Sequence, residues 1–169
     1  MNRLIRVNAV RLLLFILVQI LVLRHVSLGP YIHIFLYPIG ILLLPIGLNT
    51  ALFMLFAFLT GLSVDMFYHS LGVHAGAMVL MAFLRPFVLK LIEPHSGYEK
   101  GDAPVASKFG LIWYLEYSGI LLFLFVFTFY SLEAFSFIYW LDVLIKTILS
   151  FIVSYILVLI HQMILNPRN

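Results

Sequence analysis

The chain has 169 residues, of which 64% are hydrophobic, 16% aromatic and only 10% charged, and its mean hydropathy is +1.13. So much apolar surface cannot be buried inside one small water-soluble domain, and the composition therefore indicates a multi-span membrane protein. The formal net charge of +3 comes from lysines and arginines at the ends of apolar segments, which suits membrane lipid headgroups and argues against a nucleic-acid partner. With no cysteine, the chain offers no disulfide, no thiolate metal site and no cysteine nucleophile.

Six apolar segments predict an all-α polytopic bundle of about six transmembrane helices, forming one domain over residues 1–169. The first segment follows three arginines and lacks a small-residue cleavage site behind it, so we expect a retained span rather than a signal peptide. A polar cytoplasmic loop, residues 93–109, separates the fourth segment from the fifth. In chain order, the predicted spans cover about residues 8–26, 31–48, 50–68, 72–92, 110–131 and 139–165.

The second segment, residues 31–48, contains two prolines, Pro38 and Pro45, each of which removes a backbone hydrogen bond. As a helix it would be only about 27 Å long. It is therefore either a kinked span or a re-entrant pair. A re-entrant segment would distribute the basic loop ends over both sides of the membrane, so we expect the kinked span.

The basic residues give the orientation. With six spans, Arg24 alone falls on one side of the membrane, and the other basic loop ends fall on the opposite side. Both termini are therefore predicted to be cytoplasmic. The residues on the cytoplasmic side are Arg3, Arg6, Arg11, Lys90, Lys100, Lys108 and Arg168.

Two charged residues lie well inside predicted spans, where an ionisable group costs about 2.5 to 3.5 kcal/mol unless it is paired. At 1.5 Å per residue, Arg85 and Glu116 both lie roughly 10 Å from the cytoplasmic ends of their helices. Since their depths match, we expect them to form one buried ion pair.

A second group of ionisable residues is predicted at the outer side of the membrane. Asp65 ends the third span, while Asp142 and Lys146 open the sixth span at i,i+4 spacing and share a helix face. We expect these three residues to cluster, with His69 or His74 as a further member. A structural role for Asp65 is favoured, and a proton or ion relay remains the alternative.

Other polar residues give no sign of a metal or cofactor. Ser150, Ser154 and His161 continue one face of the last span, which we expect to look into the bundle rather than into lipid. We expect His33 and His161 to be satisfied core or interfacial histidines rather than ligands. The chain has no H-E-x-x-H motif and no closely spaced carboxylate set, so we predict no metal site.

Residues 61–64, Gly-Leu-Ser-Val, resemble only in part the G-x-S-G serine motif of rhomboid-type intramembrane proteases. Val64 replaces the second glycine. The best candidate base, His161, would lie about 15 Å from Ser63 in membrane depth, beyond the reach that a nucleophile and its base require. We therefore expect no enzymatic activity.

The residues around Asp65 form a motif of fixed order, apolar-F-x-x-G-L-x-x-D-x-x-x-x-x-x-L-G-x-H-A. This motif resembles that of the bacterial rod shape-determining protein MreD family. The resemblance extends to the chain length, the arginine-bearing N-terminus and the proline-containing second segment. The matching residues are Phe58, Gly61, Leu62, Asp65, Leu71, Gly72, His74 and Ala75.

This resemblance implies a non-enzymatic component of the bacterial cytoplasmic (inner) membrane that acts in cell elongation. The implied partners are the bitopic protein MreC, the peptidoglycan synthase and transpeptidase of the rod complex and, indirectly, the actin-like filament. The family is similar in fold to the substrate-binding S-components of energy-coupling-factor vitamin transporters, which is the alternative function. The first span has only Ala9 and lacks the A-x-x-x-A face of those components. On the leading hypothesis Asp65 pins the outer helix ends, while Gly61 and Gly72 permit close approach.

Overall fold

The computed structural model describes residues 2–26, 29–70, 72–135 and 139–165. Within these ranges it is helical apart from turns, loops and one extended segment, which confirms the all-α prediction. In chain order the elements are α1 (Asn2–Leu21), the 3-10 helix η1 (Leu23–His25), α2 (Pro38–Leu42), α3 (Thr50–Tyr68), α4 (Val73–Leu91), α5 (Ala106–Phe109), α6 (Leu111–Ala134) and α7 (Trp140–Leu165).

Four of the described helices, α3, α4, α6 and α7, are long and apolar enough to cross a membrane. Their composition and length agree with an integral membrane protein. The total of six spans stays a prediction. Each of these helices begins within one residue of the apolar segment expected from the sequence, and α6 ends three residues later.

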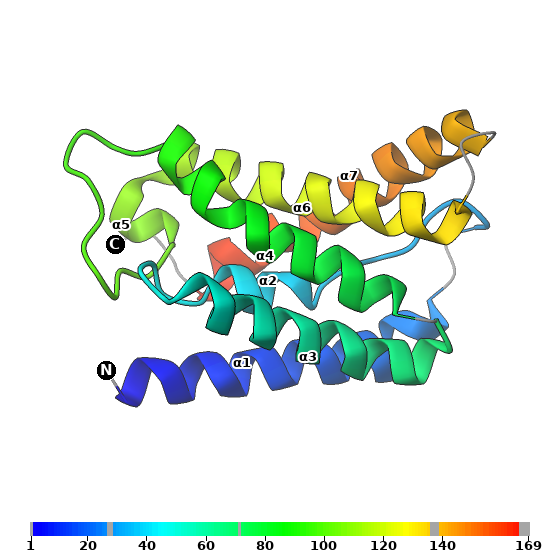
Figure 1. The fold of residues 1–169 in the computed structure, drawn as a ribbon, viewed down its shortest axis with the longest axis horizontal. Coiled ribbons are helices and arrows are strands. Elements are labelled where there is room, and N and C mark those ends of the chain that lie inside the picture. Colours follow the sequence, from blue (N-terminus) through cyan, green and yellow to red (C-terminus); the bar gives the residue numbers. More distant parts are fainter. Residues whose placement is uncertain (1, 27–28, 71, 136–138, 166–169) are drawn as a thin grey trace.

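The helices form a bundle whose two ends differ. Helices α3 and α4 make a hairpin that packs against α6, and α6 packs against α7, while α1 lies beside α2 and α3. Figure 1 shows the start of α1, α5 and the end of α7 toward one end of the bundle, called here the α5 end. The α3–α4 turn and the start of α7 lie toward the other end, called here the Asp65 end.

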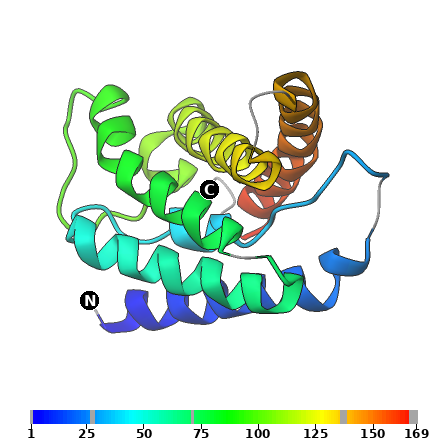
Figure 2. The same ribbon diagram turned by 45° about the vertical axis from the view of Figure 1, so that its right-hand side comes forward.

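The second apolar segment is not the kinked helix expected from the sequence. Residues 32–36 are extended, α2 follows for five residues, and turns lead into α3. Pro38 starts α2, where its missing N–H costs nothing, and Pro45 lies beyond its end, where the helix cannot continue. This segment runs along the bundle from the Asp65 end toward the α5 end, between the layer of α1 and α3 and the layer of α6 and α7 (Figures 1 and 2).

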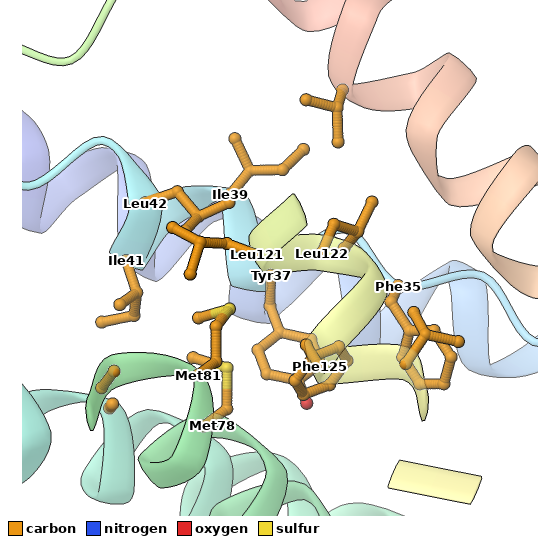
Figure 3. Close-up of a cluster of buried hydrophobic side chains, with 14 of the residues drawn as sticks. Phe35, Tyr37, Ile39, Ile41, Leu42, Met78, Met81, Leu121, Leu122 and Phe125 are labelled. Carbon is orange, nitrogen blue, oxygen red and sulfur yellow. The ribbon is translucent and has the colours of Figure 1, made fainter. Parts of the chain in front are cut away.

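The position of this segment explains why it can remain non-helical. Backbone without helical hydrogen bonds is tolerated at membrane depth only where protein surrounds it. Phe35 and Tyr37 are almost fully buried, and every residue of α2 is buried. Figure 3 shows the side chains of this segment meeting those of α4 and α6 in one cluster; the labelled residues are Phe35, Tyr37, Ile39, Ile41, Leu42, Met78, Met81, Leu121, Leu122 and Phe125.

Candidate functional site

Asp65 lies in the last turn of α3, beside the turn that leads into α4, and is only 3% exposed. One carboxylate oxygen accepts the Ser70 hydroxyl at 2.5 Å and the His74 backbone N–H at 3.0 Å. The other accepts the Ala75 backbone N–H at 2.9 Å. The residue before α4 is Gly72, which has no side chain to cap the helix. Asp65 therefore supplies the N-cap of α4 from the preceding helix, where a negative charge also favours the positive end of the helix dipole.

Gly61 lies at the closest approach of α3 and α4. A β-carbon added there would be 2.5 Å from the Ala75 Cα and 2.7 Å from the His74 carbonyl oxygen, so the two backbones touch. Gly72 has a different role from the close approach expected of it. A β-carbon there would meet nothing within 4 Å, but its φ of +82° is a left-handed conformation that favours glycine. Leu71 lies outside the described residues.

His74 links this hairpin to the buried extended segment. Its Nδ1 shares a hydrogen bond of 2.8 Å with the Tyr37 hydroxyl. Its ring packs against the rings of Tyr68 and Phe129, at centroid distances of 5.1 and 4.7 Å. The motif therefore fixes three parts of the chain relative to one another, namely α3, α4 and the residues that precede α2. We name the hydrogen-bonded group Asp65, Ser70, His74, Ala75 and Tyr37 the Asp65 clamp.

The predicted cluster of Asp65 with α7 is wrong. The carboxylate of Asp65 is satisfied within its own hairpin, because the turn after α3 brings the N–H groups at the start of α4 to it. Asp142 and Lys146 do form an ion pair, at 2.9 Å, but both side chains are partly exposed. His69 ends α3 in a left-handed conformation and is exposed.

The predicted ion pair of Arg85 with Glu116 is also wrong. Arg85 is 4% exposed, whereas Glu116 lies on an exposed face of α6. The neighbouring Tyr117 faces α4 instead, and its hydroxyl accepts the Arg85 Nε–H at 2.7 Å. The Arg85 Nη2 donates to the Leu44 carbonyl at 2.5 Å and Nη1 to the Pro45 carbonyl at 3.4 Å. A step of one residue turns a side chain by about 100° around a helix, which separates Glu116 from the face that Arg85 meets.

Two serines of α7 satisfy the backbone of the extended segment. The Ser150 hydroxyl oxygen accepts the His33 backbone N–H at 3.0 Å, and the Ser154 hydroxyl oxygen accepts that of Phe35 at 2.9 Å. Both serines are fully buried. These polar side chains therefore face the bundle interior, and they take the place of the missing helical or sheet partners.

Gln19 of α1 does the same from the opposite side. Its amide nitrogen donates to the Ile34 carbonyl at 2.8 Å, and its amide oxygen accepts the Leu36 N–H at 2.8 Å. Asn8, eleven residues or about three helical turns before Gln19 and hence on the same face of α1, donates to the Leu43 carbonyl at 3.4 Å. Neither Asn8 nor Gln19 was among the functional residues expected from the sequence. The available signal was their uncharged polar character among apolar neighbours: Gln19 is the one polar residue between Leu12 and Leu21, and Asn8 is flanked by Val7 and Ala9.

The two lone histidines differ. His33 fits the expectation of a satisfied residue, because its Nδ1 shares a hydrogen bond of 3.1 Å with the Tyr130 hydroxyl. His161 does not. It is buried with its ring edge-on to that of Phe15, at a centroid distance of 5.0 Å, and neither ring nitrogen has a hydrogen-bond partner in the described part of the chain.

The chemistry available at these sites is that of packing and hydrogen bonding. Across the described residues, no group of three or more histidines, aspartates and glutamates is arranged to hold a metal ion. The Ser63 hydroxyl donates to the Thr60 carbonyl of its own helix at 2.7 Å. Comparisons of the chain with protein-family models, with curated proteins and with solved structures found no match.

Proposed function

We propose that this chain is a non-enzymatic integral membrane component of the bacterial cell-elongation (rod) complex, of the MreD type. In this role it lies in the cytoplasmic membrane with both termini in the cytoplasm and helps MreC organise peptidoglycan synthesis and maintain cell shape. It reaches the peptidoglycan synthase and transpeptidase through that complex, and the actin-like filament indirectly.

The Asp65 clamp is the observation that carries this proposal. The motif that resembles the MreD family contributes Gly61, Asp65, Gly72 and His74, and each of them has a structural contact or conformation at one hairpin. A site built for transport or catalysis would leave polar groups of its motif directed at a ligand. Here both oxygens of the Asp65 carboxylate are used by the protein itself, which supports a scaffold whose shape a partner recognises.

The alternative is a vitamin-binding S-component. The pocket at the Asp65 end of α6 and α7 has a volume of about 260 Å³, which is below the roughly 300 Å³ that drug-sized ligands require. Three of its seven lining residues, Glu133, Asp142 and Lys146, are charged, whereas a typical ligand pocket has only a few polar groups in a largely apolar lining. These features favour the scaffold.

The proposed orientation rests on two observations. Basic residues gather in the loop before α6 and in the first turns of α1. In addition, the start of α1 and the end of α7 lie toward the same end of the bundle (Figure 1), as an even number of crossings requires. A reporter fused after Asn169 should be active only in the cytoplasm, and activity confined to the periplasm would overturn this orientation.

Affinity purification from native membranes tests the function. We expect the tagged chain to recover a bitopic coiled-coil protein together with cell-wall synthases, and an unrelated polytopic protein with the same tag and expression level to recover neither. Recovery of transporter energising subunits in their place would favour the S-component alternative. In a strain depleted of the chain, expression of the wild-type protein should restore rod shape. The fraction of rod-shaped cells should rise with the amount of partner that the tagged chain recovers.

A further inference from the structure

Arg85 carries a buried positive charge for which the described residues provide no counter-ion. The ion pairs in the described part of the chain join Asp102 to Lys108 and Asp142 to Lys146, and neither involves Arg85. Its acceptors are two carbonyl oxygens and one hydroxyl. These groups carry only partial charges, so a full positive charge remains at a depth where an unpaired ion is costly.

The guanidinium group also has hydrogen-bonding capacity left over. Arginine has five N–H donors in a planar fork. Arg85 donates three hydrogen bonds to acceptors in the described part of the chain, and the one to the Pro45 carbonyl is long, at 3.4 Å. The guanidinium carbon lies 4.4 Å from the centre of the Phe53 ring, which fixes its plane by a cation–π contact.

Arg85 lines a pocket of about 150 Å³ between α3 and α4, named here the Arg85 pocket. The volume equals roughly five water molecules at about 30 Å³ each, which is room for a phosphate group but not for a large organic ligand. The lining contains no carboxylate; it consists of Gly47, Leu48, Thr50, Phe53, Ala82, Arg85, Pro86 and Leu89.

Three further features around the Arg85 pocket favour an anion. Thr50, the first residue of the 19-residue helix α3, lines the pocket, so the positive end of that helix dipole lies beside it. Lys100 packs against Gly47 at the rim, since a β-carbon on that glycine would be 3.0 Å from the Lys100 Cγ. Arg85 lies in the half of α4 that leads to the α5 end of the bundle, six residues or about 9 Å from the end of the helix.

We propose that the Arg85 pocket binds a phosphate group, and that this group belongs to the headgroup of an anionic phospholipid. The forked guanidinium group offers two parallel N–H donors to phosphate oxygens, the geometry for which arginine is selected. The apolar residues Leu48, Phe53 and Leu89 line the same pocket, and they suit the ester and glycerol carbons of a lipid better than a free, fully hydrated phosphate. The bound lipid would then hold α3, α4 and the turn after α2 together at the α5 end. This inference is independent of the proposed function.

Lipid binding to the purified full chain tests the proposal. The protein in zwitterionic detergent micelles is titrated separately with phosphatidylglycerol, with phosphatidylcholine of the same acyl chains and with inorganic phosphate, and bound molecules are counted by native mass spectrometry. We expect one phosphatidylglycerol to bind with at least tenfold preference over phosphatidylcholine. Arg85→Gln should weaken that binding about tenfold or more, in line with the loss of charge-assisted hydrogen bonds.

Two further variants keep the test decisive if Arg85→Gln does not fold. Thr50→Phe puts a larger side chain into the pocket lining from an exposed position and leaves the Arg85 residue itself unchanged, and it should lower phosphatidylglycerol binding to a similar extent. Lys90→Gln removes an exposed positive charge from the same helix, away from the pocket, and should leave specific binding within twofold.

Each remaining outcome has one meaning. Equal binding of the two lipids, or unchanged binding by both Arg85→Gln and Thr50→Phe, would overturn the proposal. A loss with Lys90→Gln as large as that with Arg85→Gln would show general surface attraction and would overturn it too. Saturable binding of inorganic phosphate that depends on Arg85, without binding of phosphatidylglycerol, would support the phosphate site and overturn its assignment to lipid.

Discussion

Substitution of Asp65 separates a capping role from an ion-carrying role. Asp65→Leu removes the acceptor of the His74 and Ala75 backbone N–H groups at the buried start of α4. Hydrogen bonds to a charged partner contribute about 1.5 to 3 kcal/mol each, so the two together predict a loss of about 3 to 6 kcal/mol in the free energy of unfolding. Asp65→Asn keeps one oxygen, but its amide NH₂ must face one of the two N–H donors. We therefore expect Asn to lose about half as much, about 1.5 to 3 kcal/mol.

The assay is reversible unfolding of the purified variants in mixed micelles, followed by helix content. Asp142→Asn is the matched control, because Asp142 is a partly exposed carboxylate at the same end of the bundle; its effect should stay within about 1 kcal/mol. The reasoning is refuted if Asn costs as much as Leu, or if both variants are as stable as the wild type. If Asn supports normal folding and partner recovery but abolishes rod shape, an ion-coupled role of Asp65 becomes the better account.

Three further predictions concern packing, the buried segment and pH. Gly61→Ala should lower the free energy of unfolding by about 1 to 3 kcal/mol, because its β-carbon would strike the α4 backbone. Gly76→Ala is the control: its β-carbon meets only a leucine methyl group, so the free energy of unfolding should change by less than about 1 kcal/mol in the same assay. Gln19→Leu leaves one backbone N–H and one carbonyl of the extended segment without partners, so we expect a loss of about 2 to 5 kcal/mol and faster amide exchange in residues 33–37. The hydrogen bond from Lys108 lowers the pKa of Asp102 below its ordinary value of 3.8. This pair should therefore stabilise the fold at pH values above 3.8 and lose its effect as the pH falls through the lowered pKa. Asp102→Asn should abolish this acid-dependent loss of stability in thermal unfolding measured over a series of pH values.

The long helices could be predicted from the sequence because their signal is local. A run of apolar residues long enough to cross a bilayer satisfies its own backbone as a helix, whatever surrounds it. The bounds of α3, α4 and α7 consequently lie within one residue of the predicted segments. Ion pairs between side chains on different helices were harder to predict. Matching depths suggested Arg85 with Glu116, but depth says nothing of rotation about the helix axis, and Tyr117 occupies the face that meets α4.

The role of Asp65 was expected in kind, but of the residues expected to cluster with it only His74 is a hydrogen-bond partner, and through its backbone N–H. A buried carboxylate next to two glycines indicated a structural pin, and the sequence gives no direct sign of which donors will reach it. The nearest donors turned out to be backbone N–H groups nine and ten residues further along, brought back by a left-handed turn at His69 and Gly72. The carboxylate of Asp65 therefore does not need the charged side chains of α7 as partners.

The extended segment shows how polar residues in apolar helices can be interpreted. Ser150, Ser154 and Gln19 were visible in the sequence as polar residues that must avoid lipid, and two of them were expected to face the interior. Their partners are not other side chains but the unpaired backbone of the proline-containing segment beside them. A membrane chain with a proline-broken apolar run needs such side chains on the neighbouring helices, since every exposed N–H and carbonyl within the bilayer must find a partner. Prolines in one apolar segment, together with isolated polar residues in neighbouring apolar helices, therefore indicate buried non-helical backbone.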